Sequence, residues 1–263
     1  MNYRWINREC KDEDAVKQII SELNVPSPIA RVLVGRGIDT IDAVQRFFEP
    51  TLDKLHSPWL MDGMELAVDR IDKAIEAHEM IWIHGDYDVD GTASAAMVLH
   101  FLRKIGANAN YHIPSRLEEG FGFTPLSVER AREAGATVVV TVDVGVTASR
   151  AVDRANELGI DVIICDHHQA AEEIPNALTI LDPIKPGCDY PFKGLAACGV
   201  AFKLLQALSE RHGHPELAYE YLDFVAIASA ADIAPLIEEN RILSHFGLEL
   251  INSYPRPGFK GLV

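Results

Sequence analysis

The sequence contains no long apolar run and no export signal. Nowhere do about eighteen uncharged apolar residues follow one another, the length that a membrane-spanning helix requires. The first residues, Met1 to Trp5, lack the basic and then apolar layout of a signal peptide. We therefore expect a cytoplasmic protein that does not cross a membrane.

Cysteine is also scarce. Only four are present, Cys10, Cys165, Cys188 and Cys198, and no two have the CxxC spacing. A chain of 263 residues without an export signal is expected to keep its thiols reduced. Cys165 ends an apolar run, so its predicted role is packing in the core.

Basic residues are outnumbered. The 24 Lys and Arg residues stand against 39 Asp and Glu, which gives a net charge of −15. A surface for general nucleic-acid binding would be basic, so the composition argues against one. An excess of carboxylates suits a protein that holds cations. Any polyanionic ligand would then be bound by local basic groups, by metal ions, or by a domain outside this sequence.

Apolar residues make up 48% of the chain, enough for a sizeable core. Residues 1–75 indicate an irregular, mainly helical segment, with helices near 29–37, 40–44 and 65–78.

From Met80 on, short apolar strands alternate with helices, which predicts an α/β fold, a mostly parallel sheet covered by helices on both faces. Strands are predicted at Met80–His84, Ala109–Ile113, Thr137–Val142, Asp161–Cys165 and Ala177–Leu181. Helices are predicted at Thr92–Ile105, Pro125–Ala134, Ala148–Leu158 and Ala196–His212, and again from Ser229 onward.

Four potential metal ligands follow the first predicted strand: His84, Asp86, Asp88 and Asp90. A helix of small residues comes next, so this stretch is predicted as a ligand-bearing turn between a buried strand and a helix. Its side chains suit a hard or borderline divalent cation. The alternative is a solvated acidic turn that caps the helix. Such a turn needs one Asp, whereas three stand here at alternate positions behind a histidine, which favours a metal site.

Polar residues end two further predicted strands. Asp143 follows the third strand, the triplet Asp166-His167-His168 follows the fourth, and Asp232 lies later among small apolar residues. The carboxyl ends of parallel strands meet at one edge of a sheet, where ligand sites gather. Alone, Asp143 would more often cap a helix, and a histidine pair would more often be simply hydrogen-bonded. Together, without a nearby Lys or Arg, these groups need cations to compensate their burial.

Four carboxylates and two or three imidazoles suit two divalent ions that share a bridging Asp. The mixture of carboxylate and imidazole favours Mn²⁺ over Mg²⁺, whereas Zn²⁺ would more usually recruit Cys. Two ions about 3.5–4 Å apart activate a water and stabilise the leaving oxygen at a phosphoryl centre. The predicted chemistry is therefore hydrolysis of a phosphoester or phosphoanhydride.

A loop after the second predicted strand, residues 113–122, supplies a cation that could bind a phosphate, Arg116. Its glycines allow close approach of the backbone to a ligand. The alternative, a surface turn with an exposed ion pair, is equally compatible with the sequence.

These motifs resemble those of the DHH phosphoesterase superfamily, whose name is the triplet Asp166-His167-His168. The stretch from His84 to Asp90 is similar to its first motif, Asp143 to its second, and Asp232 to its fourth. The stretches HGDYDVDG, IPSRLEEGFGF, YPFKGLAACGVAFKL and ADIAPLIEENRIL, together with the lead-in, further resemble the RecJ family of bacterial single-strand-specific DNA exonucleases. The resemblance covers nearly the whole chain.

The resemblance implies a role for each motif residue. One metal would be held by Asp88 and Asp143, with His84 as a further ligand. The other would be held by Asp90, Asp143, His167 and Asp232, which makes Asp143 the bridge.

The remaining motif residues would act around the metals. His168 would contact the scissile phosphate and stabilise its developing charge. Asp86 and Asp166 would orient the histidines, with a ligand role as the alternative for Asp86. Arg116 would recognise a phosphate, that of the 5′ end above all.

The activity implied is metal-dependent 5′-to-3′ hydrolysis of single-stranded DNA to 5′-mononucleotides, in DNA repair and recombination. A single-strand-binding protein and a helicase are the protein partners to consider, and the sequence selects neither. One alternative is a DHH-family phosphodiesterase acting on short oligonucleotides or cyclic dinucleotides, which usually lacks the long lead-in. Another is a catalytically silent replication scaffold, which would have lost a ligand residue.

The resemblance also implies a division into domains. Residues 1–75 would form a helical extension packed on the core, residues 76–235 the DHH catalytic domain, and residues 236–263 a helix and the start of a linker. RecJ proteins continue into a second family-specific domain and usually a nucleotide-binding OB fold. We therefore expect this chain to correspond to the amino-terminal catalytic part, with the basic DNA clamp in the absent part.

Overall fold

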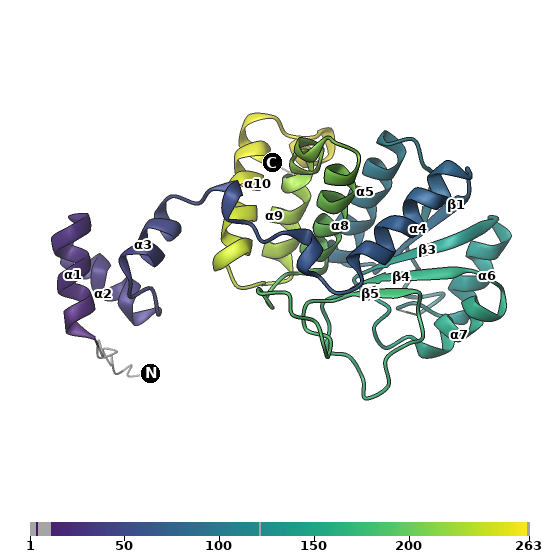
Figure 1. Ribbon diagram of the computed structural model, residues 1–263, viewed down its shortest axis with the longest axis horizontal. Coiled ribbons are helices and arrows are strands. Elements are labelled where there is room, and N and C mark those ends of the chain that lie inside the picture. The colour runs from purple at the N-terminus through teal and green to yellow at the C-terminus, as the bar shows by residue number, and fades with distance from the viewer. Residues whose placement is uncertain (1–3, 5–11, 121, 262–263) are drawn as a thin grey trace. The chain divides into compact units, whose positions relative to one another are not determined.

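The structure is a computed structural model that describes Arg4 and residues 12–120 and 122–261 (Figure 1). Cys10 therefore lies outside the described residues. The same is true of Met1 to Trp5, with the exception of Arg4. The chain divides into two compact units, Met1–Lys54 and Leu55–Val263. The domain boundaries expected from the sequence, after residues 75 and 235, stay a prediction.

The smaller unit is helical, as predicted. It contains α1 (Glu13–Leu23), α2 (Ser27–Gly35), α3 (Ile41–Phe48) and the short 3₁₀ helix η1 (Leu52–Lys54). Two of these helices begin at side-chain caps, since Asp12 accepts from the amide of Ala15 and Thr40 from that of Ala43. Their apolar faces form a small core of buried residues: Val16, Ile19, Ala30, Leu33 and Val44.

A five-stranded parallel sheet organises the larger unit, which confirms the predicted fold class. The strands are β1 (Met80–Gly85), β2 (Asn108–His112), β3 (Ala136–Val142), β4 (Asp161–Cys165) and β5 (Thr179–Leu181), in the order β2-β1-β3-β4-β5. Each predicted strand is present to within about two residues. The three central strands are almost wholly buried, which explains their continuous Val and Ile runs.

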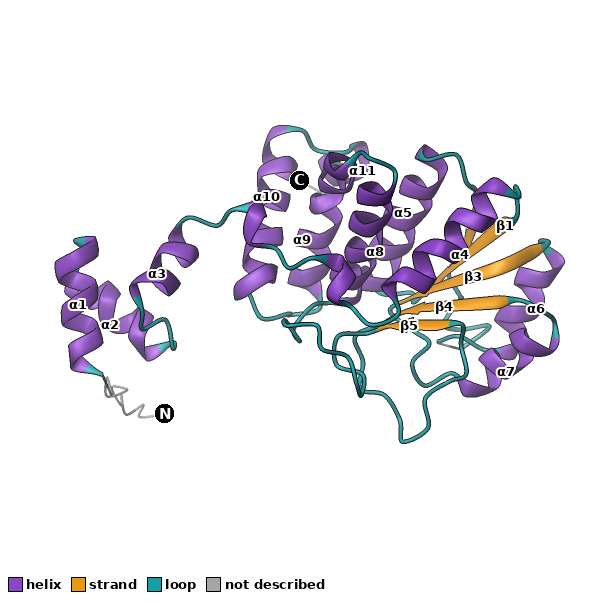
Figure 2. Ribbon diagram, viewed as in Figure 1, coloured by secondary structure: helices purple, strands orange, loops and turns teal. Residues whose placement is uncertain are grey.

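Helices cover the sheet on both sides (Figure 2). Strand β1 leads through α5 (Val89–Lys104) to β2, whereas α6 (Pro125–Glu133) and α7 (Ser149–Glu157) lie on the opposite face from α5 and connect toward β3 and β4. The face under α6 and α7 packs a cluster of buried side chains around Val139, Val162 and Ile164. Helices α4 (Met64–Glu76) and α8 (Ala197–Arg211) pack on the side of α5.

The carboxyl-terminal helices correct one prediction. The predicted helical region from Ser229 onward is present, but its bounds differ, because Ser229 lies near the end of α9 (Leu222–Ala231) and a loop separates α9 from α10 (Glu238–Ser253). Helix α9 is apolar on nearly all sides, so its sequence lacks the alternation of apolar and polar faces from which a surface helix is predicted. Gly247 of α10 allows the two helices to touch, since a Cβ there would lie 2.1 Å from the carbonyl oxygen of Leu222.

Three short helices complete the larger unit: η2 (Pro58–Leu60), η3 (Pro215–Tyr221) and α11 (Pro257–Lys260). Among the described residues, none of the helices has both the length and the apolar character to cross a bilayer. Cys165, Cys188 and Cys198 are buried and unpaired, as expected for reduced thiols.

Candidate metal centre

The predicted ligands lie where the chain reverses its direction across the sheet. From β1 the chain moves outward to β2, then crosses back to β3 on the other side of β1. Such a switch point opens a crevice beyond the carboxyl ends of the two strands that flank it, here β1 and β3, and ligands of open α/β sheets bind there. The turn after β1 and Asp143 after β3 flank this crevice.

The turn after β1 is held tightly against the start of α5. Asp88 caps the helix, because its Oδ1 accepts from the amide of Gly91 at 2.9 Å. A side chain at Gly91 would place a Cβ 2.5 Å from the amide nitrogen of Asp86, so only glycine lets the turn fold back in this way. In this turn the ligand atoms of Asp86 and Asp88 lie within 4.8 Å of each other and of a carboxylate oxygen of Asp143.

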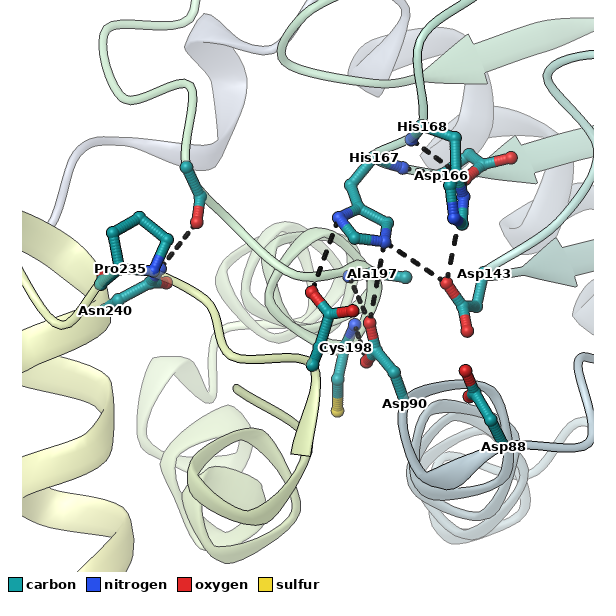
Figure 3. A network of polar contacts seen from close by, with 12 residues as sticks. Asp88, Asp90, Asp143, Asp166, His167, His168, Ala197, Cys198, Pro235 and Asn240 are labelled. Carbon is teal, nitrogen blue, oxygen red and sulfur yellow. Dashed lines mark hydrogen bonds and ion pairs between the residues drawn. The ribbon is translucent and has the colours of Figure 1, made fainter. Parts of the chain in front are cut away.

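Asp90 lies in the first turn of α5 and faces the start of α8 (Figure 3). Its carboxylate accepts from the amides of Ala197 and Cys198, both at 2.8 Å. These are two of the amides that a helix N-terminus leaves without a partner inside the helix. The carboxylate therefore ties α5 to α8 across the crevice, and each oxygen keeps a further lone pair for a ligand.

Asp143 adopts a left-handed backbone conformation, with φ of 65°. Asp is one of the few residues with a side chain that tolerates this region. Its amide donates to the carbonyl of Cys165 at 3.0 Å, which extends the pairing of β3 with β4 by one residue. The carboxylate is thereby turned toward the histidines that follow β4.

His167 is the side chain around which the carboxylates gather (Figure 3). Its Nε2 lies 3.3 Å from Asp143 and 3.9 Å from Asp90, and its Nδ1 lies 3.9 Å from Asp232. His168 contacts Asp166 instead, with Nδ1 and Oδ1 2.8 Å apart. Asp166 also accepts from three backbone amides, those of Val146, His167 and His168, so it holds the whole histidine turn.

Three groups of potential ligand atoms result, each spanning less than 4.8 Å among the described residues: Asp86, Asp88 and Asp143; Asp90, His167 and Asp232; and Asp143, His167 and His168. Asp143 belongs to two of them. His84 belongs to none, because its ring is buried and its Nε2 lies 3.2 Å from the carbonyl oxygen of Gly122. The structure therefore brings together every predicted ligand except His84, and it places Asp86, for which a ligand role was the alternative, in one of the three groups.

The electrostatics of the cluster fit a bound cation. Burial raises the pKa of Asp90 to about 6 and that of Asp143 to about 7. Burial opposes protonation of His167, but its contact with Asp143 is strong enough to raise the pKa of the imidazole. No lysine or arginine of the described residues lies within ion-pair distance of Asp90 or Asp143, whose ion-pair contacts are with histidines. A divalent cation would supply the missing positive charge.

Arg116 lies beside the turn after β1. Its guanidinium stands 5.1 Å from the ring centroid of Tyr87, the residue between Asp86 and Asp88. The loop that carries Arg116 is anchored at its far end by Glu119, which contacts His112 at 2.9 Å and Arg130 at 2.6 Å. Glu119 thus binds the loop to β2 and α6, while Arg116 extends over the ring of Tyr87.

This anchor makes the stability of the protein depend on pH. Burial opposes ionisation of Glu119, but its contacts with His112, Ser115 and Arg130 lower its pKa from 4.5 to about 2. A lowered folded-state pKa stabilises the fold above pH 4.5, and this contribution is lost as the pH falls toward 2. We expect Glu119→Gln to lower the free energy of unfolding at pH 7 and to have a smaller effect at about pH 3.5, measured by urea unfolding. Equal effects at both pH values would contradict this interpretation.

One acidic residue at this edge of the sheet was not predicted. Asp182 directly follows β5, is fully buried, and accepts from the amide of Ile184 through Oδ1. Its Oδ2 has no hydrogen-bond partner among the described residues, and burial raises its pKa to about 6. The same rule that selected Asp143, an Asp at the end of an apolar strand, would have found it.

The buried side-chain amide of Asn240 joins two loops of the carboxyl-terminal half, one that leads to the amides bound by Asp90 and one that carries Asp232. Asn240 of α10 donates through Nδ2 to the carbonyl oxygens of Gly194, at 2.5 Å, and Pro235, at 3.1 Å (Figure 3). Gly194 stands three residues before Ala197, whose amide binds Asp90, and Pro235 stands three residues after Asp232. Asn240 is therefore placed to fix both loops at the crevice.

We expect Asn240→Leu, which removes these donors at similar volume, to weaken Mn²⁺ binding by about 10-fold to 100-fold, as loss of a group that orients metal ligands typically does. Isothermal titration calorimetry with Mn²⁺ measures this. The matched control is Asn252→Leu, since exposed Asn252 donates, within the described part of the chain, to Leu248 of its own helix. Unchanged Mn²⁺ affinity in Asn240→Leu would show that the two loops hold their positions without the amide.

Comparison with known proteins agrees with this geometry. The model of the DHH family, N-terminal domain, matches residues 80–229. The single-stranded-DNA-specific exonuclease RecJ of Bacillus subtilis is 41% identical over 96% of this chain, and that of Escherichia coli is 35% identical over 96%. The chain spans only 31% and 45% of these two relatives, so less than half of either.

Solved structures agree as well. A crystal structure of exonuclease RecJ bound to manganese matches 81% of this chain and 53% of its own, with a TM-score of 0.72 and 35% identity. RecJ from Thermus thermophilus in complex with Mn²⁺ matches 94% of this chain and 35% of its own, with a TM-score of 0.78 and 29% identity. Because the family model covers more than half of the 263 residues, including every residue of the cluster except Asp232, the chain belongs to the DHH family.

Proposed function

We propose that this chain is the catalytic part of a metal-dependent exonuclease that degrades single-stranded DNA from its 5′ end to 5′-mononucleotides, in DNA repair and recombination. The observation that carries the proposal is the pair of buried carboxylates beside His167, Asp90 and Asp143, which have no lysine or arginine of the described residues to neutralise them and which face Asp232 across the same imidazole. The relatives named as RecJ support the choice of substrate, since they match the chain over nearly its whole length.

The groups around Asp143 would hold two divalent cations. Asp88 and Asp143 would hold one, with Asp86 a better-placed third ligand than His84. Asp90, Asp143, His167 and Asp232 would hold the other. Mn²⁺ is the cation we favour, with Mg²⁺ as the alternative, because imidazole and carboxylate are mixed. When bound, the pair supplies an activated water and charge stabilisation at the phosphate.

The remaining residues would bind and orient the substrate. Asp166 holds Nδ1 of His168, so Nε2 is left to donate to a phosphate oxygen, and the contact with Asp166 raises the pKa of His168 to about 9. A protonated imidazole would stabilise negative charge that develops on the phosphate. Arg116, whose guanidinium lies beside Tyr87, would bind a second phosphate, for which we propose the one at the 5′ end. We keep a single-strand-binding protein and a helicase as predicted protein partners.

The test is digestion of single-stranded DNA labelled at its 5′ end, with Mn²⁺, Mg²⁺ or EDTA. The proposal predicts that labelled mononucleotide is the first product and that EDTA abolishes its release. Rapid hydrolysis of dinucleotides with no degradation of long strands would favour the phosphodiesterase of short substrates. Binding of DNA without any metal-dependent cleavage would favour the catalytically silent scaffold.

A further inference from the structure

The loop that carries Asp232 has an unusual residue at its start. Helix α9 ends at Ala231, and Ile233 then adopts the left-handed conformation, with φ of 57°. The amide of Ala234 donates to Ser229 at 2.9 Å, and that of Ile233 to Ala230 at 3.3 Å. This is the hydrogen-bond pattern of a Schellman cap, in which the left-handed position strongly favours glycine.

Five other helices of the larger and smaller units follow that preference, whereas α4 has His78 at this position, with φ of 54°. The position after the cap residue is a glycine with positive φ in α2, α5, α6, α7 and α8, namely Gly37, Gly106, Gly135, Gly159 and Gly213. Helix α9 uses isoleucine at the equivalent place. A β-branched side chain at positive φ is a genuine outlier, because its Cβ substituents crowd the backbone. Local stability therefore does not account for Ile233.

Burial does not account for it either. The side chain of Ile233 is 88% exposed, and those of Leu236 and Ile237 in the same loop are 52% and 51% exposed. An isoleucine that strains the backbone and buries almost nothing within the chain gains nothing from the fold. Strained residues of this kind cluster at functional sites, where a contact with something outside the chain is what retains them.

The location indicates what that contact is. Ile233 directly follows Asp232, whose carboxylate lies 3.9 Å from His167, and consecutive Cα atoms are about 3.8 Å apart. A nucleotide whose phosphate reached the metal centre would have its sugar and base within reach of a loop that starts at one of the candidate ligands. An apolar tip can pack against the face of a nucleobase or insert between two bases, as isoleucine and leucine do in proteins that unstack DNA.

We propose that Ile233 is an apolar wedge that packs on a nucleobase next to the scissile phosphate and so favours unpaired strands. The inference rests on the proposed exonuclease function and adds a specificity-determining contact to it. In a single strand the base can turn its face toward Ile233, and such contacts tolerate any sequence. In a duplex an interior base has both faces covered by its stacked neighbours, and pairing with the opposite strand prevents even a terminal base from turning toward Ile233.

Ile233→Gly separates this role from a structural one. Glycine relieves the strain at positive φ, so the melting temperature is expected to stay unchanged or rise. The same substitution removes the wedge, so kcat/KM on single-stranded DNA with Mn²⁺ is expected to fall by about 10-fold, the size of one lost base contact. Ile233→Val, which keeps an apolar branched side chain, should retain most of the activity.

The substrate supplies the second arm of the test. On a strand with abasic nucleotides around the scissile bond, wild-type protein and Ile233→Gly should cleave at the same rate, because there is no base for the wedge to contact. The inference would be overturned if wild-type protein and Ile233→Gly cleaved intact strands at equal rates. It would also be overturned if the substitution lowered the cleavage rate by the same factor on intact and abasic strands. If wild-type protein cleaves neither strand with metal present, the proposed function itself fails, a result distinct from both.

Discussion

Asp143→Asn is expected to lower the rate of DNA hydrolysis by about 10³-fold or more, because loss of a shared ligand removes several kcal/mol of stabilisation by the cations. Asp143 belongs to two of the three ligand groups and lies 3.3 Å from His167. Asparagine has the same shape and tolerates the left-handed conformation that Asp143 adopts, so the substitution changes charge and leaves geometry intact.

Stability provides the internal check on this variant. In metal-free protein the buried carboxylate of Asp143 is costly, as its raised pKa indicates, so Asp143→Asn should be at least as stable as wild type. Added Mn²⁺ should raise the melting temperature of wild-type protein strongly and that of the variant little. Asp189→Asn, an exposed position, is the matched control. Wild-type activity in Asp143→Asn would refute the assignment of Asp143 as the shared ligand.

The second large effect is a loss of folding stability, expected when a buried ion pair away from the candidate metal centre is broken. Lys203 of α8 is fully buried, and its ammonium lies 2.7 Å from Glu239 of α10. The same carboxylate accepts from Tyr190 and from the amide of His56, and the ammonium donates to the carbonyl of His56. Burial lowers the pKa of Lys203, while Glu239 opposes this effect. The network joins four distant segments of the larger unit.

We expect Lys203→Met to lower the free energy of unfolding by about 3–5 kcal/mol, measured by urea unfolding, because it leaves Glu239 charged and unpaired in the core. Lys104→Met is the matched control, since the pair of Lys104 with Glu220 is solvent-exposed and worth about 1 kcal/mol at most. The double variant Lys203→Met/Glu239→Gln should recover part of the loss, since the unpaired charge is gone. A loss below about 1 kcal/mol in Lys203→Met would contradict this expectation.

The sequence predicted the sheet and most of the site for one physical reason. Buried parallel strands are continuous apolar runs, so their ends are visible, and polar residues at those ends must meet at one edge. This rule alone groups Asp88, Asp143 and His167. It would also have found Asp182, whose strand is only three residues long and therefore weakly marked.

Contacts between distant segments could not be predicted in this way. Asp90 binds amides more than a hundred positions away in the sequence, and Asn240 joins two loops that no pattern relates. Backbone amides carry no signal in the sequence, because every residue except proline has one. For the same reason the contact of His84 with the carbonyl of Gly122 could not be foreseen, and His84 was predicted as a ligand from its place in the motif.

The number of cations that the chain holds is the most direct test of a shared metal centre. Native mass spectrometry of the protein titrated with Mn²⁺, alongside the rate of mononucleotide release, relates activity to occupancy. We predict two ions per wild-type chain, activity that begins only when the second binds, and fewer than two ions in Asp143→Asn. Full activity with one ion, or two ions retained by Asp143→Asn, would contradict a two-cation centre that shares Asp143.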